Sequence, residues 1–247
     1  MTKTIVPRSH NLVLRKPGKL VPFGIPGSNP GRGVFLFITF LNTKLFSVDE
    51  NKMSIILSLQ GSMAVGKTTA AKYVQDNLPD VTVSYEDISS VISEIKKRNL
   101  DKNTFEGYVE IQRLFIKAEI KRWTELKKYP LSLIDMGPGE IEFHTLHYPK
   151  ALSKDWDVES ALSQELDELR KCKIDETLFL EASTQKLTQH KENDKTRSRT
   201  FFDFYTKYML DAKKKWYVER NARFVNVDTL SKEEVGQVVL DWVKSFI

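Results

Sequence analysis

The stretch SIILSLQGSMAVGKTT, residues 54–69, decides the fold of this chain. It begins with an apolar run that is typical of a buried strand. Its residues 61–68 then match the pattern G-x-x-x-x-G-K-[ST] at every fixed position. The amphipathic stretch that follows, AAKYVQDNL at 70–78, predicts a helix. A strand, a glycine-rich loop and a helix in this order indicate a phosphate-binding loop.

The residue types in this loop suit a nucleotide. Gly61 and Gly66 permit backbone turns that direct N–H groups inward at a phosphate. We expect Lys67 to reach the β- and γ-phosphate oxygens and the Thr68 hydroxyl to hold Mg²⁺. The predicted nucleotide site is formed by Gly61, Ser62, Met63, Ala64, Val65, Gly66, Lys67, Thr68 and Thr69.

Beyond the loop, short apolar runs alternate with longer amphipathic stretches. The apolar runs predict strands at 54–59, 81–85, 131–135, 176–181 and 223–227. Apolar residues from Phe201 to Trp216 recur at helical spacing and predict one long helix, with the run Lys213–Lys215 on its exposed face. This alternation predicts an α/β fold of three layers, a P-loop NTPase fold with a five-stranded parallel sheet flanked by helices and a small helical lid.

Residues 1–52 differ from the rest of the chain. They hold 8 of the 38 Lys and Arg, only 2 of the 33 Asp and Glu, 5 of the 9 prolines and 5 of the 11 glycines. A segment of this kind without helical or alternating period cannot offset the entropy of ordering. We therefore expect a poorly ordered extension before a single domain at 53–247.

The stretch GSNPGRG at 27–33 is what the T-arm of a transfer-RNA gene would give if translated in frame. We hypothesise that translation of the native protein begins at Met53. An intact mass beginning at Met1 would contradict this hypothesis.

Charge and composition exclude several classes of protein. Without residues 1–52 the net charge is −1, so no cationic field indicates a nucleic-acid partner. No uncharged apolar run reaches the roughly 18 residues that predict a membrane span. Cys172 is the one cysteine, which excludes an internal disulfide. We expect a cytoplasmic protein that binds a nucleotide and a small-molecule acceptor, with neither nucleic acid nor membrane as partner, and we leave a homodimer open.

The loop occurs in motors, switches, transporters and kinases, so other residues must choose among these classes. The chain has neither an LSGGQ-like signature nor the NKxD of guanine-binding switches. A kinase of small molecules needs acids near the reacting groups and a basic lid, because phosphoryl transfer requires positioning, charge neutralisation and exclusion of water. Glu86 and Asp87 follow the second predicted strand, and Asp135 ends the third. The stretch HKENDKTRSRTFF supplies Arg197 and Arg199.

The order of these features resembles the P-loop nucleoside and nucleotide kinases, the group that includes deoxynucleoside kinases and thymidylate kinase, over roughly 53–245. Glu86 resembles their glutamate after strand two. Gln112 resembles their base-pairing glutamine, with Arg113 beside it as a further substrate-binding candidate. The resemblance implies ATP and Mg²⁺ as cofactors, Thr68 and Asp135 as metal-binding residues, and a lid at about 186–202. The implied catalytic residues are Lys67, Glu86, Asp87, Asp135, Arg197 and Arg199.

The acceptor stays open at this stage. Met136 replaces the arginine that the family has after the acid of strand three, and GPGE follows it. A nucleoside, a nucleoside monophosphate, or an antibiotic-like or sugar-like alcohol therefore remain candidates. The alternative from another class is a non-kinase P-loop ATPase or nucleotide-binding regulatory module. A kinase should enclose a pocket lined by Glu86, Gln112 and Asp135, whereas a switch should present an open surface.

His144 and His147 are three residues apart and could share a helix face with Glu140. Two histidines and a carboxylate at this spacing could hold a metal. The alternative is that they line the acceptor pocket or cap a loop.

Overall fold

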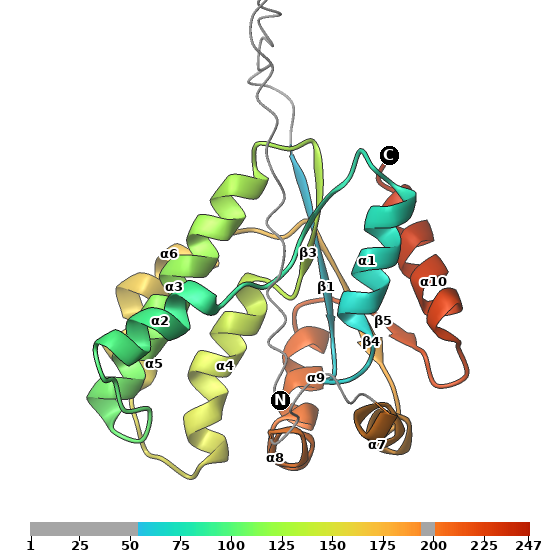
Figure 1. The fold of residues 1–247 in the computed structure, drawn as a ribbon. Coiled ribbons are helices and arrows are strands. Elements are labelled where there is room, and N and C mark those ends of the chain that lie inside the picture. Colours follow the sequence, from blue (N-terminus) through green and yellow to red (C-terminus); the bar gives the residue numbers. More distant parts are fainter. Residues whose placement is uncertain (1–53, 194–200) are drawn as a thin grey trace, which may run out of the picture. The chain divides into compact units, whose positions relative to one another are not determined.

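The computed structural model describes residues 54–193 and 201–247 (Figure 1). All of them belong to one compact unit, Asp49–Ile247. The expected extension at 1–52, the hypothetical start at Met53, and the lid candidates Arg197 and Arg199 lie outside the described residues.

A parallel sheet forms the centre of this unit. Its strands are β1 (Ile55–Gly61), β2 (Thr82–Ser84), β3 (Leu131–Asp135), β4 (Glu176–Glu181) and β5 (Arg223–Asn226). Their order across the sheet is β2-β3-β1-β4-β5, and every neighbouring pair is parallel. All five residues of β3 are buried, as expected for an apolar strand covered on both faces. The predicted five-stranded parallel sheet is confirmed.

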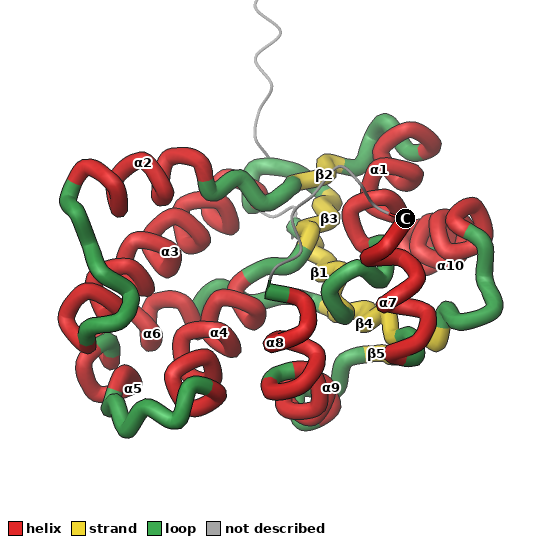
Figure 2. The backbone as a smooth tube through the Cα atoms, turned by 60° about the horizontal axis from the view of Figure 1, so that its bottom comes forward, coloured by secondary structure: helices red, strands yellow, loops and turns green. Residues whose placement is uncertain are grey.

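Helices cover both faces of the sheet, so the predicted layers are confirmed (Figure 2). One face carries α1 (Lys67–Asn77) and α10 (Lys232–Lys244). Toward the other lie α2 (Ser89–Lys97), α3 (Phe105–Leu126), α4 (Pro138–Ala151), α5 (Val158–Ala161), α6 (Ser163–Arg170), α8 (Phe202–Tyr208) and α9 (Leu210–Val218). The remaining helix, α7 (Thr184–Asn193), follows β4. No helix in the described part of the chain combines the length and apolar composition needed to cross a membrane.

The main core lies between the sheet, α1 and α10. Leu57 and Leu59 of β1 are fully buried there, together with Val74 of α1 and Val239 of α10. Ser231 is the N-cap of α10, and its side chain accepts a hydrogen bond from the backbone N–H of Glu234 in a capping box. Burial of these apolar faces fixes α1, and with it the phosphate loop that precedes it, against the sheet.

The helix predicted from Phe201 to Trp216 is divided in two. Met209 leaves the helical conformation, with φ −123° and ψ −26°, so α8 ends before it and α9 begins after it. α4 spans Glu140, His144 and His147, for which the sequence analysis considered a shared helix face without predicting the bounds of a helix. Its first residue is Pro138, a favoured residue at this position because its missing N–H has no helical partner to lose.

Candidate active site

The phosphate loop joins β1 to α1, and its backbone needs glycine at two positions. Gly61 has φ +146° and Gly66 has φ +104°. A Cβ atom at Gly61 would lie 2.3 Å from the backbone oxygen of Leu180 on β4, so a side chain cannot fit there. A Cβ at Gly66 would have nothing within 4 Å, and only its backbone conformation favours glycine.

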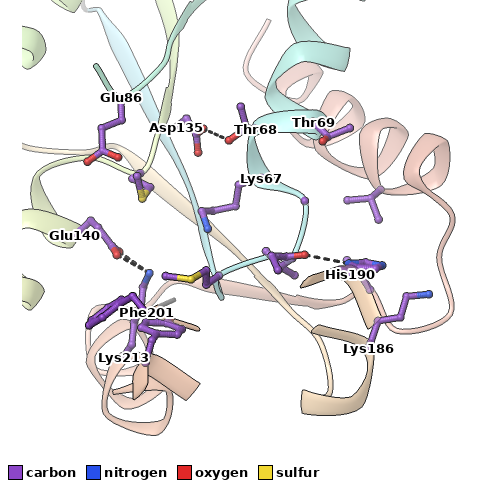
Figure 3. Close-up of a pocket in the computed structure, with 18 of the residues that line it drawn as sticks. Lys67, Thr68, Thr69, Glu86, Asp135, Glu140, Lys186, His190, Phe201 and Lys213 are labelled. Atoms are coloured by element: carbon purple, nitrogen blue, oxygen red, sulfur yellow. Dashed lines mark hydrogen bonds and ion pairs between the residues drawn. The ribbon is translucent and has the colours of Figure 1, made fainter. Parts of the chain in front are cut away.

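Lys67 is the first residue of α1, and its side chain points into the site (Figure 3). Its Nζ atom donates to the backbone oxygens of Gly61 at 3.2 Å and Ser62 at 3.0 Å. Burial, and to a smaller extent the nearby ammonium of Lys213, lower the pKa of Lys67 to about 8, against the raising effect of neighbouring carboxylates. A bound anion would therefore stabilise the charged form of Lys67.

Thr68 and Asp135 present oxygen atoms at the same place. The Thr68 hydroxyl donates to Oδ2 of Asp135 at 2.7 Å. Oδ1 of Asp135 is buried and has no hydrogen-bond partner among the described residues. These hard oxygen donors fit Mg²⁺, which takes one or two protein ligands and completes its shell with phosphates and water. No group of three or more His, Cys, Asp or Glu in the described chain offers an all-protein metal cage.

A cavity of about 1310 Å³ opens beside the loop. It joins the seven loop residues from Met63 to Thr69 to side chains from other elements. Among the predicted site residues, those that line it are Met63, Ala64, Val65, Gly66, Lys67, Thr68, Thr69, Glu86, Gln112 and Asp135. Gly61 and Ser62 contribute the carbonyl groups below Lys67 and do not line the cavity.

The two acids after β2 face different surroundings. Glu86 lines the cavity; its side chain is exposed to solvent, and the protein packed around it removes only part of its hydration. This desolvation raises the pKa of Glu86, although Arg122 opposes the effect. Asp87 does not line this cavity. Its carboxylate accepts hydrogen bonds from the hydroxyl and the backbone N–H of Ser89, at 2.6 and 2.9 Å, and these bonds lower the pKa of Asp87.

The two substrate-binding candidates on α3 also diverge. Gln112 lines the cavity, and its Oε1 accepts a hydrogen bond of 3.0 Å from the hydroxyl of Thr145 on α4. Arg113 does not line the cavity. Its guanidinium pairs with Glu110 on the same helix and with Glu165 on α6. Neighbouring residues of a helix point about 100° apart, so they cannot both face one site.

Solved structures share this arrangement of strands and helices. Thymidylate kinase from Candida albicans is 15% identical over 78% of this chain and 92% of its own, with a TM-score of 0.50. Deoxyadenosine kinase from M. mycoides with bound dCTP is 15% identical over 77% of this chain and all of its own, with a TM-score of 0.55. The same enzyme with dCMP and dCDP gives 13% identity and a TM-score of 0.52. The fold is that of the P-loop nucleoside and nucleotide kinases. No protein-family model and no curated protein sequence matches the chain.

Within this kinase fold, the turn after Asp135 has an unusual backbone. Met136 has φ +67° and Gly137 has φ +133°. The Ser58 hydroxyl holds this turn by donating to the Met136 backbone oxygen at 2.6 Å. Met136 lines the cavity at the position where the resemblance leads one to expect an arginine. The turn leads directly into α4 and places Glu140 in its first turn.

A buried ion pair beside the loop was missed by the sequence analysis. Lys213 of α9 lies 2.7 Å and 2.6 Å from the two carboxylate oxygens of Glu140 (Figure 3). The prediction that Lys213 lies on an exposed face is wrong, because its side chain is only 2% exposed. A signal was present: Lys213 follows the buried Tyr205 and Met209 at intervals of four residues, which places all three on one helical face.

His144 and His147 of α4 lie in different surroundings and do not form one site. His144 lines the cavity with Nε2 3.4 Å from Oε1 of Glu140. The His147 ring instead stacks on Phe143, with 4.5 Å between ring centroids, and its Nδ1 lies 3.1 Å from the Phe143 backbone oxygen. A further histidine, His190 of α7, bonds to the Ala64 backbone oxygen of the loop at 3.0 Å and was not predicted. The pocket alternative thus suits His144, and the described residues offer no metal site at this pair.

Proposed function

We propose that this chain is an ATP- and Mg²⁺-dependent phosphotransferase whose acceptor is a nucleoside or a nucleoside monophosphate. The observation that carries the proposal is that the phosphate loop, Glu86 and Gln112 line the same cavity. The fold shared with nucleoside and nucleotide kinases supports the same reaction class. The site belongs to the domain at 53–247, with the lid at about 186–202.

The donor half of the site is the phosphate loop. Lys67 and the loop N–H groups bind the β- and γ-phosphates, and the N-terminus of α1 adds its positive dipole. Mg²⁺, held by Thr68 and Asp135, would neutralise charge on these phosphates. Arg197 and Arg199, assigned to the lid from the R-x-R pattern, stabilise charge on the transferred group.

The acceptor half lies across the cavity. Glu86 accepts the proton of the acceptor hydroxyl, and its raised pKa brings it closer to the range in which a base works well. We assign this role to Glu86 rather than Asp87, because only Glu86 lines the cavity. Gln112 binds the base of the acceptor through its amide. Arg113 would first have to leave Glu110 and Glu165, so we assign the contact to Gln112.

Two alternatives remain to be separated by experiment. A regulatory ATPase would lack a chemical role for Glu86, and a cavity beside the loop that is lined by Glu86, Gln112 and Asp135 favours the kinase. Met136 stands where the resemblance leads one to expect an arginine that would hold an acceptor phosphate. An antibiotic-like or sugar-like alcohol is therefore the second acceptor class.

The test is a thermal-shift screen of nucleosides, nucleoside monophosphates and aminoglycoside-like alcohols, in the presence of Mg²⁺ and a non-hydrolysable ATP analogue. Compounds that stabilise the protein are then incubated with γ-labelled ATP. We expect label to move to one acceptor class and the Lys67→Ala variant to lose this transfer. Lys72→Met, an exposed change on the same helix, is the matched control. Release of inorganic phosphate at an equal rate with every compound would contradict the kinase and favour an ATPase.

A further inference from the structure

Two lysine ammonium groups share one backbone oxygen at the base of the phosphate loop. Nζ of Lys67 donates to the Gly61 oxygen at 3.2 Å, and Nζ of Lys213 donates to the same oxygen at 3.1 Å. The proposed function gives Lys67 a role and leaves Lys213 without one. The two side chains come from opposite parts of the domain, α1 and α9.

Lys213 is held in place as a buried cation. Both carboxylate oxygens of Glu140 lie within 2.7 Å of its Nζ. Burial alone would lower the pKa of Lys213, but Glu140 and Tyr205 together outweigh it and raise that pKa. Burial alone would raise the pKa of Glu140, but Lys213 and His144 lower it. A buried charge is tolerated when it is paired in this way, so Lys213 has no freedom to leave Glu140 at low cost.

Lys67 differs from Lys213, because the partners of its ammonium group are backbone carbonyl groups. Its Nζ atom donates to the carbonyl groups of Gly61 and Ser62. To reach the phosphates it must leave both. A buried carbonyl that loses its donor raises the free energy of the bound state, because neither protein nor water replaces the lost bond. Gly61 is buried, and Lys213 also donates to its oxygen, so this oxygen would keep a donor if Lys67 left.

We propose that Lys213, fixed by Glu140, is a positioning residue of the phosphate loop, which keeps the Gly61 carbonyl bonded while Lys67 moves to a nucleoside diphosphate or triphosphate. The inference rests on the proposed function only in requiring that the loop bind a nucleotide. Lys213 acts through Lys67 and Gly61 and does not touch the transferred group.

The experiment measures nucleotide binding in the full chain by titration calorimetry with Mg²⁺. The double variant Glu140→Leu, Lys213→Met removes both buried charges together and leaves neither alone. Thermal melting checks that it folds, and Lys213→Arg, which keeps the charge and donors, is the second variant. Lys215→Met is the matched control, because Lys215 is exposed on the same helix. ADP and AMP are the probes, since AMP lacks the phosphates that Lys67 would reach.

We expect the double variant to bind ADP about tenfold more weakly, as the loss of one donor to a buried acceptor implies. AMP should bind as in the wild type, and Lys213→Arg should recover most of the ADP affinity. Equal weakening of ADP and AMP would show general damage to the loop and overturn the inference, as would unchanged ADP binding. If the wild type binds no ADP, the proposed function fails as well. If it binds ADP but phosphorylates no acceptor, only the proposed function fails.

Discussion

Thr68, in the first turn of α1, and Asp135, the last residue of β3, are 67 positions apart in the sequence and are joined by a hydrogen bond of 2.7 Å. The bond connects the phosphate loop to the end of a neighbouring strand, where ligands gather in open α/β sheets. It leaves Oδ1 of Asp135 buried without a partner in the described part of the chain. A cation held by Asp135 would satisfy this oxygen.

The first prediction concerns this pair. Asp135→Asn keeps the size of the side chain and removes its charge, so the turnover number should fall about 10- to 100-fold and the Mg²⁺ concentration for half-maximal activity should rise. Steady-state rates measured over a Mg²⁺ titration check both effects. Asp76→Asn, an exposed change on α1, is the control. An unchanged Mg²⁺ requirement would remove Asp135 from the metal site.

The second prediction concerns the pH dependence of activity. Glu86 acts as a base only when ionised, and desolvation raises its pKa above the ordinary value for glutamate. As the pH falls through this raised pKa, the carboxylate is protonated and kcat/KM declines. The decline should therefore begin at a higher pH than an unperturbed glutamate, with a pKa of about 4.3, would give.

The same pH profile separates the two acids after β2. Glu86→Gln should lower kcat about 10²- to 10⁴-fold and abolish the decline on the acidic side. Asp87→Asn should retain that decline, because hydrogen bonds to Ser89 hold Asp87 outside the cavity and lower its pKa. The reverse result would assign the base to Asp87.

The third prediction concerns the two loop glycines. Gly61→Ala places a Cβ atom 2.3 Å from the Leu180 oxygen in a backbone conformation that suits glycine, so the free energy of unfolding should fall by about 2 kcal/mol or more. Gly66→Ala meets no neighbour within 4 Å, and its cost should be about 1 kcal/mol from backbone strain alone. Urea unfolding of both variants measures the difference. An equal loss of stability in the two variants would contradict the close contact between Gly61 and Leu180 of β4.

The fourth prediction rests on the sequence, since Arg197 lies outside the described residues. If Arg197 belongs to a lid over the transferred phosphate, Arg197→Ala should lower kcat by about 10³-fold and change ATP affinity much less. Arg199→Ala should behave similarly, and Arg223→Ala at the exposed start of β5 is the control. Loss of ATP affinity equal to the loss in kcat would argue against a lid.

Local sequence patterns were sufficient to predict much of the fold. The strands lie within two residues of their predicted ends, because apolar runs between helical periods are local signals. The order of strand, loop and helix around Gly61 and Lys67 follows from the same contiguous residues. The acids at the ends of β2 and β3 could also be expected to approach the loop, because parallel strands end at one edge.

The tertiary structure decided what the patterns left equivalent. Glu86 and Asp87 are neighbouring carboxylates, and Gln112 and Arg113 are neighbouring side chains that can form hydrogen bonds. In each pair only the packing of the surrounding residues decides which side chain faces the cavity. The break at Met209 was likewise invisible to a periodicity that continues across it.

Lys213 shows the physical reason most clearly. A lysine on its own is expected in water, because burying an unpaired charge is too costly. Its burial depends on Glu140, 73 residues earlier in the chain, and its contact with Gly61 spans 152 residues. The sequence by itself determined the phosphate loop and the sheet that carries it, since both arise from neighbouring residues. Only the tertiary structure decided which charged side chains meet beneath that loop, since their stability comes from partners that the sequence does not place beside them.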